Sequence, residues 1–240
     1  MIFPGPDSAI FYLDPAAGLD SSNRWIDSSK YQLNVTPVGY AAPNYGLSLG
    51  PSGAPRITFD GAAQYGTIAA PANARFFAAA QTNQATVAVV ARHNSPASGD
   101  RIFSSTNGAL TRGMDISMIP GGSANQMECR GYSAAGAICL IPRDGDDTPY
   151  LSRTRVTILA GRGADALALR WIDGVGRTAA YPVAASADPV AYDAAVVPTV
   201  GRHSAGAFYF DGDLYFLGIW PLVFTDSEAL AFSAYWMDRT

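Results

Sequence analysis

The stretch that decides the fold lies near the end of the chain and reads Phe208-Tyr-Phe-Asp-Gly-Asp-Leu-Tyr-Phe-Leu-Gly-Ile-Trp220. After its Asp-Gly turn, apolar side chains occupy both alternating sets of positions up to Trp220. A strand that is apolar on both faces is expected at the centre of a sheet, where it is covered from both sides. The following Thr225-Asp-Ser-Glu228 has the pattern of a capping box and predicts a short helix over Asp226–Met237.

An earlier segment, Arg56-Ile-Thr-Phe-Asp-Gly-Ala-Ala-Gln-Tyr-Gly-Thr-Ile68, repeats the same Phe-Asp-Gly sequence. In both copies the Phe supplies an apolar anchor before a turn. The Asp can accept a hydrogen bond from a nearby amide, and the Gly tolerates positive φ. An Asp-Gly pair alone is a weak signal, because it favours many tight turns. The two copies therefore indicate the fold, and they give little information about a catalytic or binding site.

Strand-like runs bounded by Gly, Pro, Asn or Asp recur along the rest of the chain. Short strands at this spacing predict an all-β fold, a two-sheet antiparallel jelly-roll sandwich with one short C-terminal helix. A further short helix is predicted near residues 73–79, where Phe76 and Phe77 would dock it. The expected strands are at residues 9–13, 56–59, 65–68, 85–92, 101–105, 113–119, 125–132, 137–141, 153–161, 166–172, 177–182, 195–200 and 207–220.

The domain organisation expected from the 240 residues is a single domain over 1–240, since all-β sandwiches commonly reach this length as one unit. Residues 1–52 are rich in Gly, Pro, Ser and Asn and show little regular pattern. We expect this N-terminal segment to wrap the sandwich, because Trp25, Ile26, Tyr31 and Leu33 give it apolar side chains to bury.

Charge and composition exclude several classes of protein. The net charge of −4, the scattered arginines and the single lysine, Lys30, argue against a nucleic-acid binder. No window reaches the roughly 18 apolar residues that a membrane helix needs. Met1-Ile-Phe-Pro-Gly-Pro-Asp7 lacks the basic start and the apolar run of a signal peptide. Synthesis in the cytoplasm without export is therefore expected.

Taken in order, five segments resemble the laminin-G-like jelly rolls of the concanavalin A-like lectin/glucanase superfamily. The resemblance departs from the family at two points, since no glycine follows the serine of the first segment and the third lacks the family's tryptophan. The matching segments are Trp25-Ile-Asp-Ser-Ser-Lys30 with Asn34-Val-Thr36, Ile57-Thr-Phe-Asp-Gly-Ala-Ala-Gln-Tyr-Gly-Thr-Ile68, residues 85–92, Leu167-Ala-Leu-Arg-Trp-Ile-Asp-Gly174, and Phe210-Asp-Gly-Asp-Leu-Tyr-Phe-Leu-Gly-Ile-Trp220 with Thr225-Asp-Ser-Glu228.

The resemblance is to jelly rolls of the type found in virion proteins of tailed bacteriophages. It implies a non-enzymatic structural or adhesive protein of the virion: a capsid decoration, a head fibre or a tail-associated protein. Such a protein would dock on other virion proteins, as a homo-oligomer, after synthesis in the host cytoplasm. The alternative is a lectin-like, carbohydrate-binding module that recognises a host surface glycan.

The catalytic pattern of the superfamily's glucanases is absent from the sequence. Retaining glucanases of this class place two glutamates close together on one strand, whereas Glu128 and Glu228 are the only glutamates here. The only histidines are His93, expected in an exposed loop, and His203, expected at a strand end or turn. We therefore predict no enzyme, no catalytic residues and no bound cofactor.

Two kinds of binding site remain open at this level. Calcium could be held by Asp144-Gly-Asp-Asp147, or next by Asp211 and Asp213, but solvated acidic turns explain the same residues and no metal site is assigned. A sugar could stack on a tryptophan, although packing in the core is the favoured role for all four. The tryptophans are Trp25, Trp171, Trp220 and Trp236.

The two cysteines, Cys129 and Cys139, flank Tyr132-Ser-Ala-Ala-Gly136, which is typical of a hairpin turn. A turn centred on Ala134 would place the two cysteines opposite each other. Two free thiols are the favoured interpretation for a protein made in the cytoplasm, and a cross-strand disulfide is the alternative if it reaches an oxidising exterior. Two cysteines without nearby histidines make only half of a zinc site.

Overall fold

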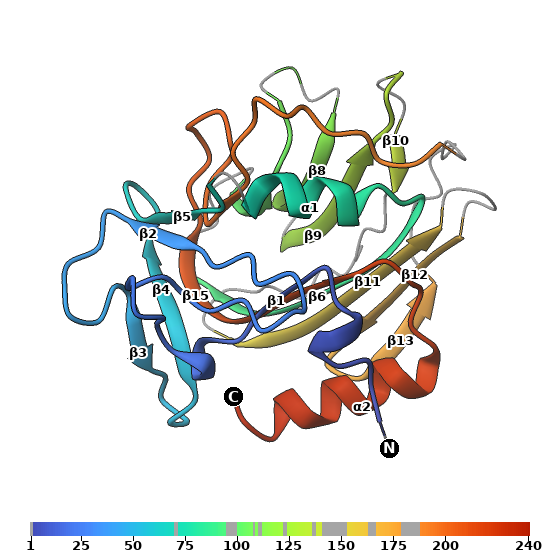
Figure 1. Ribbon diagram of the computed structural model, residues 1–240. Coiled ribbons are helices and arrows are strands. Elements are labelled where there is room, and N and C mark those ends of the chain that lie inside the picture. The colour runs from blue at the N-terminus through green and yellow to red at the C-terminus, as the bar shows by residue number, and fades with distance from the viewer. Residues whose placement is uncertain are drawn as a thin grey trace.

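Two antiparallel β-sheets stack as a sandwich, which confirms the predicted fold class (Figure 1). The computed structural model describes residues 2–69, 72–94, 100–107, 109, 112–121, 124–135, 138–140, 153–162, 167–178 and 188–240. The larger sheet runs in the order β13 (Val175–Thr178), β12 (Leu167–Ile172), β11 (Arg155–Arg162), β6 (Gln84–His93), β15 (Asp211–Trp220), β4 (Pro55–Asp60) and β3 (Leu47–Leu49), and β1 (Phe11–Leu13) also pairs with β15.

The smaller sheet faces the larger one and lies above it in Figure 1. Its strands run in the order β10 (Ile138–Leu140), β9 (Ala124–Tyr132), β8 (Gly113–Gly121), β7 (Arg101–Ser104), β14 (Thr199–Val200), β5 (Tyr65–Thr67) and β2 (Thr36–Val38). β5 and β7 both pair with the two-residue β14, so segments far apart in the sequence meet at this end of the sheet.

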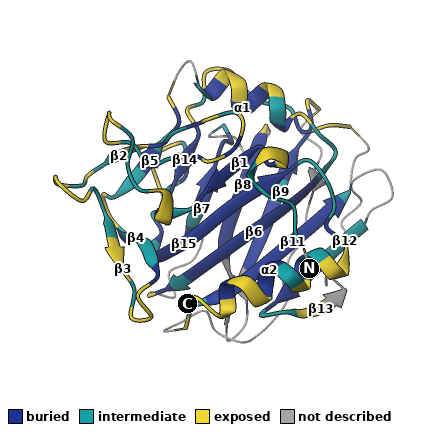
Figure 2. Cartoon of the chain, turned by 60° about the horizontal axis from the view of Figure 1, so that its bottom comes forward, coloured by how far each residue is buried: buried dark blue, intermediate teal, exposed yellow. Residues whose placement is uncertain are grey.

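Strand β15 is the centre of the larger sheet, as its apolar pattern predicts. It pairs with β6 on one edge, and with β4 and then β1 on the other. Every residue from Gly212 to Trp220 is buried, and Figure 2 shows β15 and its neighbours β6 and β11 buried along most of their length. The strand begins at Asp211, not at residue 207, because the preceding residues form a separate loop.

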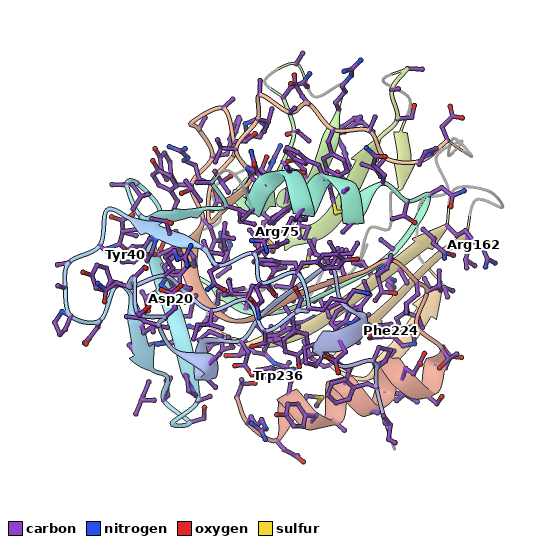
Figure 3. The ribbon with its side chains drawn as sticks, viewed as in Figure 1. Asp20, Tyr40, Arg75, Arg162, Phe224 and Trp236 are labelled. Atoms are coloured by element: carbon purple, nitrogen blue, oxygen red, sulfur yellow. The ribbon has the colours of Figure 1, made fainter. Side chains whose placement is uncertain are left out.

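Buried apolar side chains cover both faces of the larger sheet. One core fills the space between the sheets and includes Phe59, Leu217 and Ile219. A second core lies under α2 (Asp226–Met237), where Phe224 and Trp236 lie between the helix and the sheet (Figure 3). Strand β15 contributes side chains to both cores, which explains why both of its faces are apolar.

The capping box predicted at the start of α2 is present. The Thr225 amide donates to Glu228 Oε2 at 2.7 Å, and the Glu228 amide donates to Thr225 Oγ1 at 3.3 Å. Within the described part of the chain, no helix combines the length and the apolar character needed to cross a membrane.

Leu230, Ala231, Ala234 and Tyr235 share one face of α2, but this is not the face that the helix buries. The residues that the helix buries are Ala229, Phe232, Ser233 and Trp236. The rings of Phe232 and Trp236 lie 5.2 and 5.1 Å from the ring of Phe216, between centroids. Packing of these large rings against the sheet sets the orientation of the helix and leaves Leu230 44% exposed.

The short helix predicted near residues 73–79 is confirmed as α1 (Ala72–Ala80). Phe76 and Phe77 are buried, as expected. The Phe76 ring lies 5.3 Å from the Phe103 ring, and the Phe77 ring stacks on Tyr192 at 5.1 Å. α1 is therefore held to the smaller sheet by aromatic contacts.

Residues 1–52 hold three short strands, β1, β2 and β3, and two 3-10 turns, η1 (Pro6–Ser8) and η2 (Pro15–Ala17). The buried Asp27 carboxylate ties this segment together, because it accepts hydrogen bonds from the amides of Tyr12, Ser29 and Leu33. Of the three strands, β1 and β3 belong to the larger sheet and β2 to the smaller, so the segment contributes to both sheets.

The predicted direct opposition of Cys129 and Cys139 is wrong. The register pairs Ile138 with Tyr132 and Leu140 with Gly131, so Cys139 lies opposite residues 131–132, nearer to the turn than Cys129. Ser133, the residue after β9, forms a bridge to Val190. Cys129 is buried, whereas the side chain of Cys139, and with it the disulfide alternative, lies outside the described residues.

Candidate functional site

His93 does not lie in an exposed loop, and that prediction is wrong. It is the last residue of β6, only 1% exposed, with Nε2 2.7 Å from Asp100 Oδ2. Its ring stacks on Phe210 at 5.6 Å. The sequence after it suggested a loop, but the tertiary partners Asp100 and Phe210 bury the imidazole.

His203 lies in the loop between β14 and β15, at a turn as predicted, and it is buried. The Ala205 amide donates to Nδ1 at 3.1 Å, so a neutral imidazole has its hydrogen on Nε2. Nε2 lies 3.1 Å from Thr106 Oγ1, and that hydroxyl donates to Asp115 Oδ1 at 3.0 Å. A buried relay from His203 to Asp115 thus runs beneath the loop.

Burial is the largest influence on the pKa of His203 and lowers it below the ordinary value of 6.5. The Asp115 carboxylate opposes this shift, and the guanidinium groups of Arg101 and Arg202 add to it. The imidazole is therefore neutral at pH 7 and acts as a fixed hydrogen-bonding part of the loop.

The loop over residues 201–210 is closed by its own backbone. The His203 amide donates to the Ala207 carbonyl at 2.9 Å, and the Phe210 amide donates to the Gly201 carbonyl at 2.9 Å. The Arg101 amide also donates to the Phe208 carbonyl at 3.1 Å, which ties the loop to β7. These bonds give the loop a fixed shape at the rim of the smaller sheet.

Phe208 is the most exposed aromatic side chain in the described part of the chain, with 51% of its surface accessible. Its backbone has a φ of 57°, a conformation that is strained for a bulky residue. The Arg101 guanidinium carbon lies 5.3 Å from the centre of its ring, and the His203 ring meets it edge-on at 6.1 Å. The fold thus holds a large ring in water at a conformational cost.

Arg202, which belongs to the same loop as Phe208, stacks on two tyrosines. Its guanidinium carbon lies 3.5 Å from the ring centre of Tyr65 and 5.7 Å from that of Tyr209. The two tyrosine rings pack edge to face at 6.1 Å. Arg202 Nε is buried and makes no hydrogen bond in the described structure. Cation–π stacking thus fixes the guanidinium while leaving hydrogen-bond donors for a ligand.

We call this surface the aromatic–arginine rim and define it by Tyr65, Arg101, Arg202, Phe208 and Tyr209. The rim joins β5, β7 and the β14–β15 loop, which β14 holds together. Its aromatic faces can contact apolar ring surfaces, and its guanidinium groups can donate to hydroxyl or carboxylate oxygens. That combination suits a polyhydroxylated or acidic ligand.

The rim was not predicted from the sequence as a site. Phe208 and Tyr209 belong to the stretch that decides the fold, but they were assigned to the strand that follows. The two tyrosines that flank Arg202 come from segments about 140 residues apart, and only β14 pairing brings them together. The turn signal in Ser204-Ala-Gly206 was the one local hint that a loop intervenes.

The paired carboxylates of the larger sheet serve the fold. Asp60 and Asp211 lie opposite each other on β4 and β15. Burial acts to raise the pKa of Asp60, but hydrogen bonds from the amides of Ala63, Ala62 and Gln64 outweigh it and lower that pKa. A glycosidase acid needs a raised pKa, so this pair does not have the properties of a glucanase centre.

The metal candidates have other partners or lie outside the described residues. Asp213 is a strand residue, not part of a turn, and it pairs with Arg56 Nη1 at 2.5 Å and Thr58 Oγ1 at 2.9 Å. Among the described residues, no group of three His, Cys, Asp or Glu is placed to hold a metal ion. The Asp144–147 cluster lies outside the described residues.

All four tryptophans are packed in the interior, as favoured from the sequence. Trp25 is 1% exposed and its Nε1 donates to the Tyr45 carbonyl at 2.8 Å, so it offers no platform for a sugar. Trp171, Trp220 and Trp236 are 2%, 0% and 4% exposed. Any aromatic platform must therefore be sought elsewhere.

Comparison with known proteins supports the sandwich fold. No protein-family model matches the sequence, and a search of curated proteins finds no match. Among solved structures, the chain is similar to the binding domain of botulinum neurotoxin DC in complex with SialylT, at a TM-score of 0.60 and 13% identity. The match covers 96% of this chain and 52% of the other, so this chain spans about half the length of the neurotoxin domain.

Two further structures are similar along most of their own length. Domain 4 of AbnA, an extracellular GH43 arabinanase from Geobacillus stearothermophilus, in complex with arabinotriose, has a TM-score of 0.59 and 15% identity, over 95% of this chain and all of the other. The CBM40 of Ruminococcus gnavus IT-sialidase, bound to α2,3-sialyllactose, has a TM-score of 0.50 and 13% identity, over 68% and 88%. Identities this low establish the fold alone.

Proposed function

We propose that this chain is a non-catalytic carbohydrate-binding domain and that the aromatic–arginine rim is its glycan site. The observation that carries the proposal is Phe208, a large ring that the fold holds exposed in a strained backbone conformation. Such strain persists where the surroundings enforce it, and it concentrates at ligand-binding positions. Similar sandwich structures were solved with SialylT, arabinotriose and sialyllactose bound, which supports the same ligand class.

The rim has the chemistry that sugar recognition requires. The axial C–H groups of a pyranose are weakly positive and pack on the negative face of an aromatic ring such as Phe208. The guanidinium of Arg202 can donate to hydroxyl groups beside that face, or in pairs to a sugar carboxylate. Because Tyr65 already holds this guanidinium in place, little side-chain entropy is lost on binding.

The network beneath the rim supports binding without catalysis. A nucleophile needs access to substrate and an adjacent base. Thr106, the hydroxyl next to His203, is fully buried and already bonded to Asp115. We therefore assign these groups the role of holding the β14–β15 loop in shape.

A glycan array that includes neutral and sialylated glycans tests the proposal. The wild-type chain should bind a defined group of glycans, and Phe208→Ala should abolish that binding or weaken it at least about tenfold. The matched control is Tyr235→Ala, which removes the other exposed aromatic of the described chain, 36% exposed on α2. Equal binding by wild type and Phe208→Ala would refute the assignment of the site, and binding to no glycan would refute the proposed function.

Substitution of Arg202 shows whether the bound ligand is acidic or neutral. Arg202→Met keeps most of the packing on Tyr65 but removes the charge and the donors. If the ligand is acidic, this change should weaken binding more than Arg75→Met, which removes one charge from the exposed face of α1. If the ligand is neutral, Phe208→Ala should have the larger effect of the two rim changes.

The sequence resemblance also predicts a place in a bacteriophage particle, with virion proteins as partners and a homo-oligomeric assembly. These remain predictions that rest on the resemblance. An adhesive virion protein could use a glycan-binding rim to recognise its host, so the two functions are compatible. Co-sedimentation of the expressed chain with purified particles would test the virion role independently of glycan binding.

A further inference from the structure

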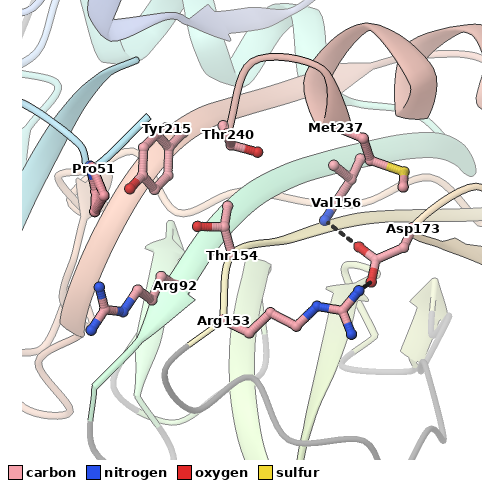
Figure 4. Close-up of a pocket in the computed structure, with 9 residues that line it drawn as sticks. All are labelled: Pro51, Arg92, Arg153, Thr154, Val156, Asp173, Tyr215, Met237 and Thr240. Carbon is pink, nitrogen blue, oxygen red and sulfur yellow. Dashed lines mark hydrogen bonds and ion pairs between the residues drawn. The ribbon is translucent and has the colours of Figure 1, made fainter. Parts of the chain in front are cut away.

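A hollow of about 400 Å³ opens on the outer face of the larger sheet, near the C-terminal end of β6. Its lining includes Arg92 from β6, Tyr215 from β15, Arg153 and Thr154 from the segment before β11, and Asp173 from the β12–β13 turn. Figure 4 shows these side chains around the same space. The volume is in the range of sites that take ligands of about monosaccharide size.

Some hydrogen-bonding groups in the hollow have partners within the protein, and others have none among the described residues. Asp173 Oδ1 accepts from the Val156 amide at 3.0 Å, and its Oδ2 accepts from Arg153 Nη2 at 3.1 Å. Both oxygens of this carboxylate, which belongs to the one acidic side chain among the described lining residues, therefore already have partners. Arg92 Nε, by contrast, is buried and makes no hydrogen bond in the described structure.

Among the described residues, Arg92 also has no acidic partner. Asp213 lies opposite it in the register of β6 and β15, but its carboxylate pairs with Arg56 and Thr58 instead. Arg92 is half-buried and lines the hollow, so its guanidinium can donate charge-assisted hydrogen bonds to an oxyanion there. The hydroxyl groups of Thr154 and Tyr215 also line this space and could donate to the same ligand.

We propose that this hollow is a second binding site, which takes a small ligand bearing a carboxylate or phosphate group. Arg92 holds the oxyanion, and the Tyr215 hydroxyl and Arg153 contact the rest of the ligand. The site is separate from the aromatic–arginine rim, because Arg92 projects from the outer face of the larger sheet, whereas its neighbour His93 projects inward against Phe210.

Isothermal titration of the full chain with glucuronate, glucose 6-phosphate and glucose tests this proposal. Binding of either anionic sugar with little or no binding of glucose is the expected result, and which one binds identifies the oxyanion as carboxylate or phosphate. Binding should weaken as salt is added, because the interaction is between charges. No binding by either anion, or equal binding of glucose, would overturn the proposal.

Substitutions in the lining test whether the anionic sugar binds in the hollow. Arg92→Met should weaken the anionic sugar at least about tenfold, as loss of a charge-assisted hydrogen bond predicts. Tyr215→Phe removes only the hydroxyl and should weaken it a few-fold. Arg75→Met is the matched charge control. If Arg92→Met binds like wild type while Arg202→Met does not, the anion occupies the rim, and this proposal fails while the proposed function stands.

Discussion

The rings of Phe59 and Phe210 meet edge to face with their centroids 5.7 Å apart. Each is the Phe of a Phe-Asp-Gly sequence, and β4 and β15 place the two sequences antiparallel, with Asp60 opposite Asp211. The Gly61 amide donates to the Phe210 carbonyl at 3.1 Å, which closes the contact. The two copies of the motif are therefore one paired corner, and this corner anchors the start of the strand that follows the rim loop.

The first prediction concerns this corner. Phe59 is 1% exposed and its ring also lies 5.9 Å from Trp25, so Phe59→Ala should leave a cavity between the sheets. The free energy of unfolding should fall by about 3–5 kcal/mol. Urea denaturation followed by tryptophan fluorescence measures this change. A loss below about 1 kcal/mol would mean that the corner does not anchor the sandwich.

The second prediction concerns the strain at Phe208. Phe208→Gly removes the exposed ring and permits the φ of 57° without steric cost. We expect unfolding stability to stay within about 1 kcal/mol of wild type, or to rise, while glycan binding is lost. Thermal melts and glycan binding on the same sample provide the two readouts. A large loss of stability would show that the ring supports the fold. Its position would then be explained without a ligand.

The third prediction follows from the pKa of His203, which burial lowers below 6.5. Because the folded protein resists protonation, the unfolded chain binds more protons once the pH falls below 6.5. Stability contributed by the neutral imidazole is therefore complete above pH 6.5 and decreases as the pH falls toward the lowered pKa. His203→Gln should flatten this part of the stability curve between about pH 6.5 and 5, where few carboxyl groups titrate.

The measurement for His203 is urea denaturation across that pH range, with wild type and variant compared at each pH. An equally steep fall in both proteins would assign the pH dependence to other groups. The same titration should leave the rim unchanged above pH 6.5, because the neutral relay to Thr106 and Asp115 stays intact there.

The features that the sequence predicts well are those set by local pattern. Apolar residues on both faces of β15 require a central strand, and the capping box at Thr225 defines the start of α2 by its own hydrogen bonds. The short α1 is also indicated within its own segment, by Phe76 and Phe77. These elements need no knowledge of distant partners.

The features that sequence reasoning missed depend on contacts between distant segments. The buried position of His93 comes from Phe210 and Asp100, and the orientation of α2 comes from Phe216. The register at Cys139 is set by the pairing of Ile138 with Tyr132 and of Leu140 with Gly131. The rim likewise unites segments that only the pairing of β14 with β5 and β7 brings together.

The most direct test of the central claim is an NMR titration of the ¹⁵N-labelled chain with the best glycan from the array. The account predicts that the shifted amides cluster at Tyr65, Arg101 and residues 202–209, and that Phe208→Ala removes these shifts. Shifts confined to another surface, such as the hollow around Arg92, or the same shifts in Phe208→Ala, would contradict the assignment of the rim as the glycan site.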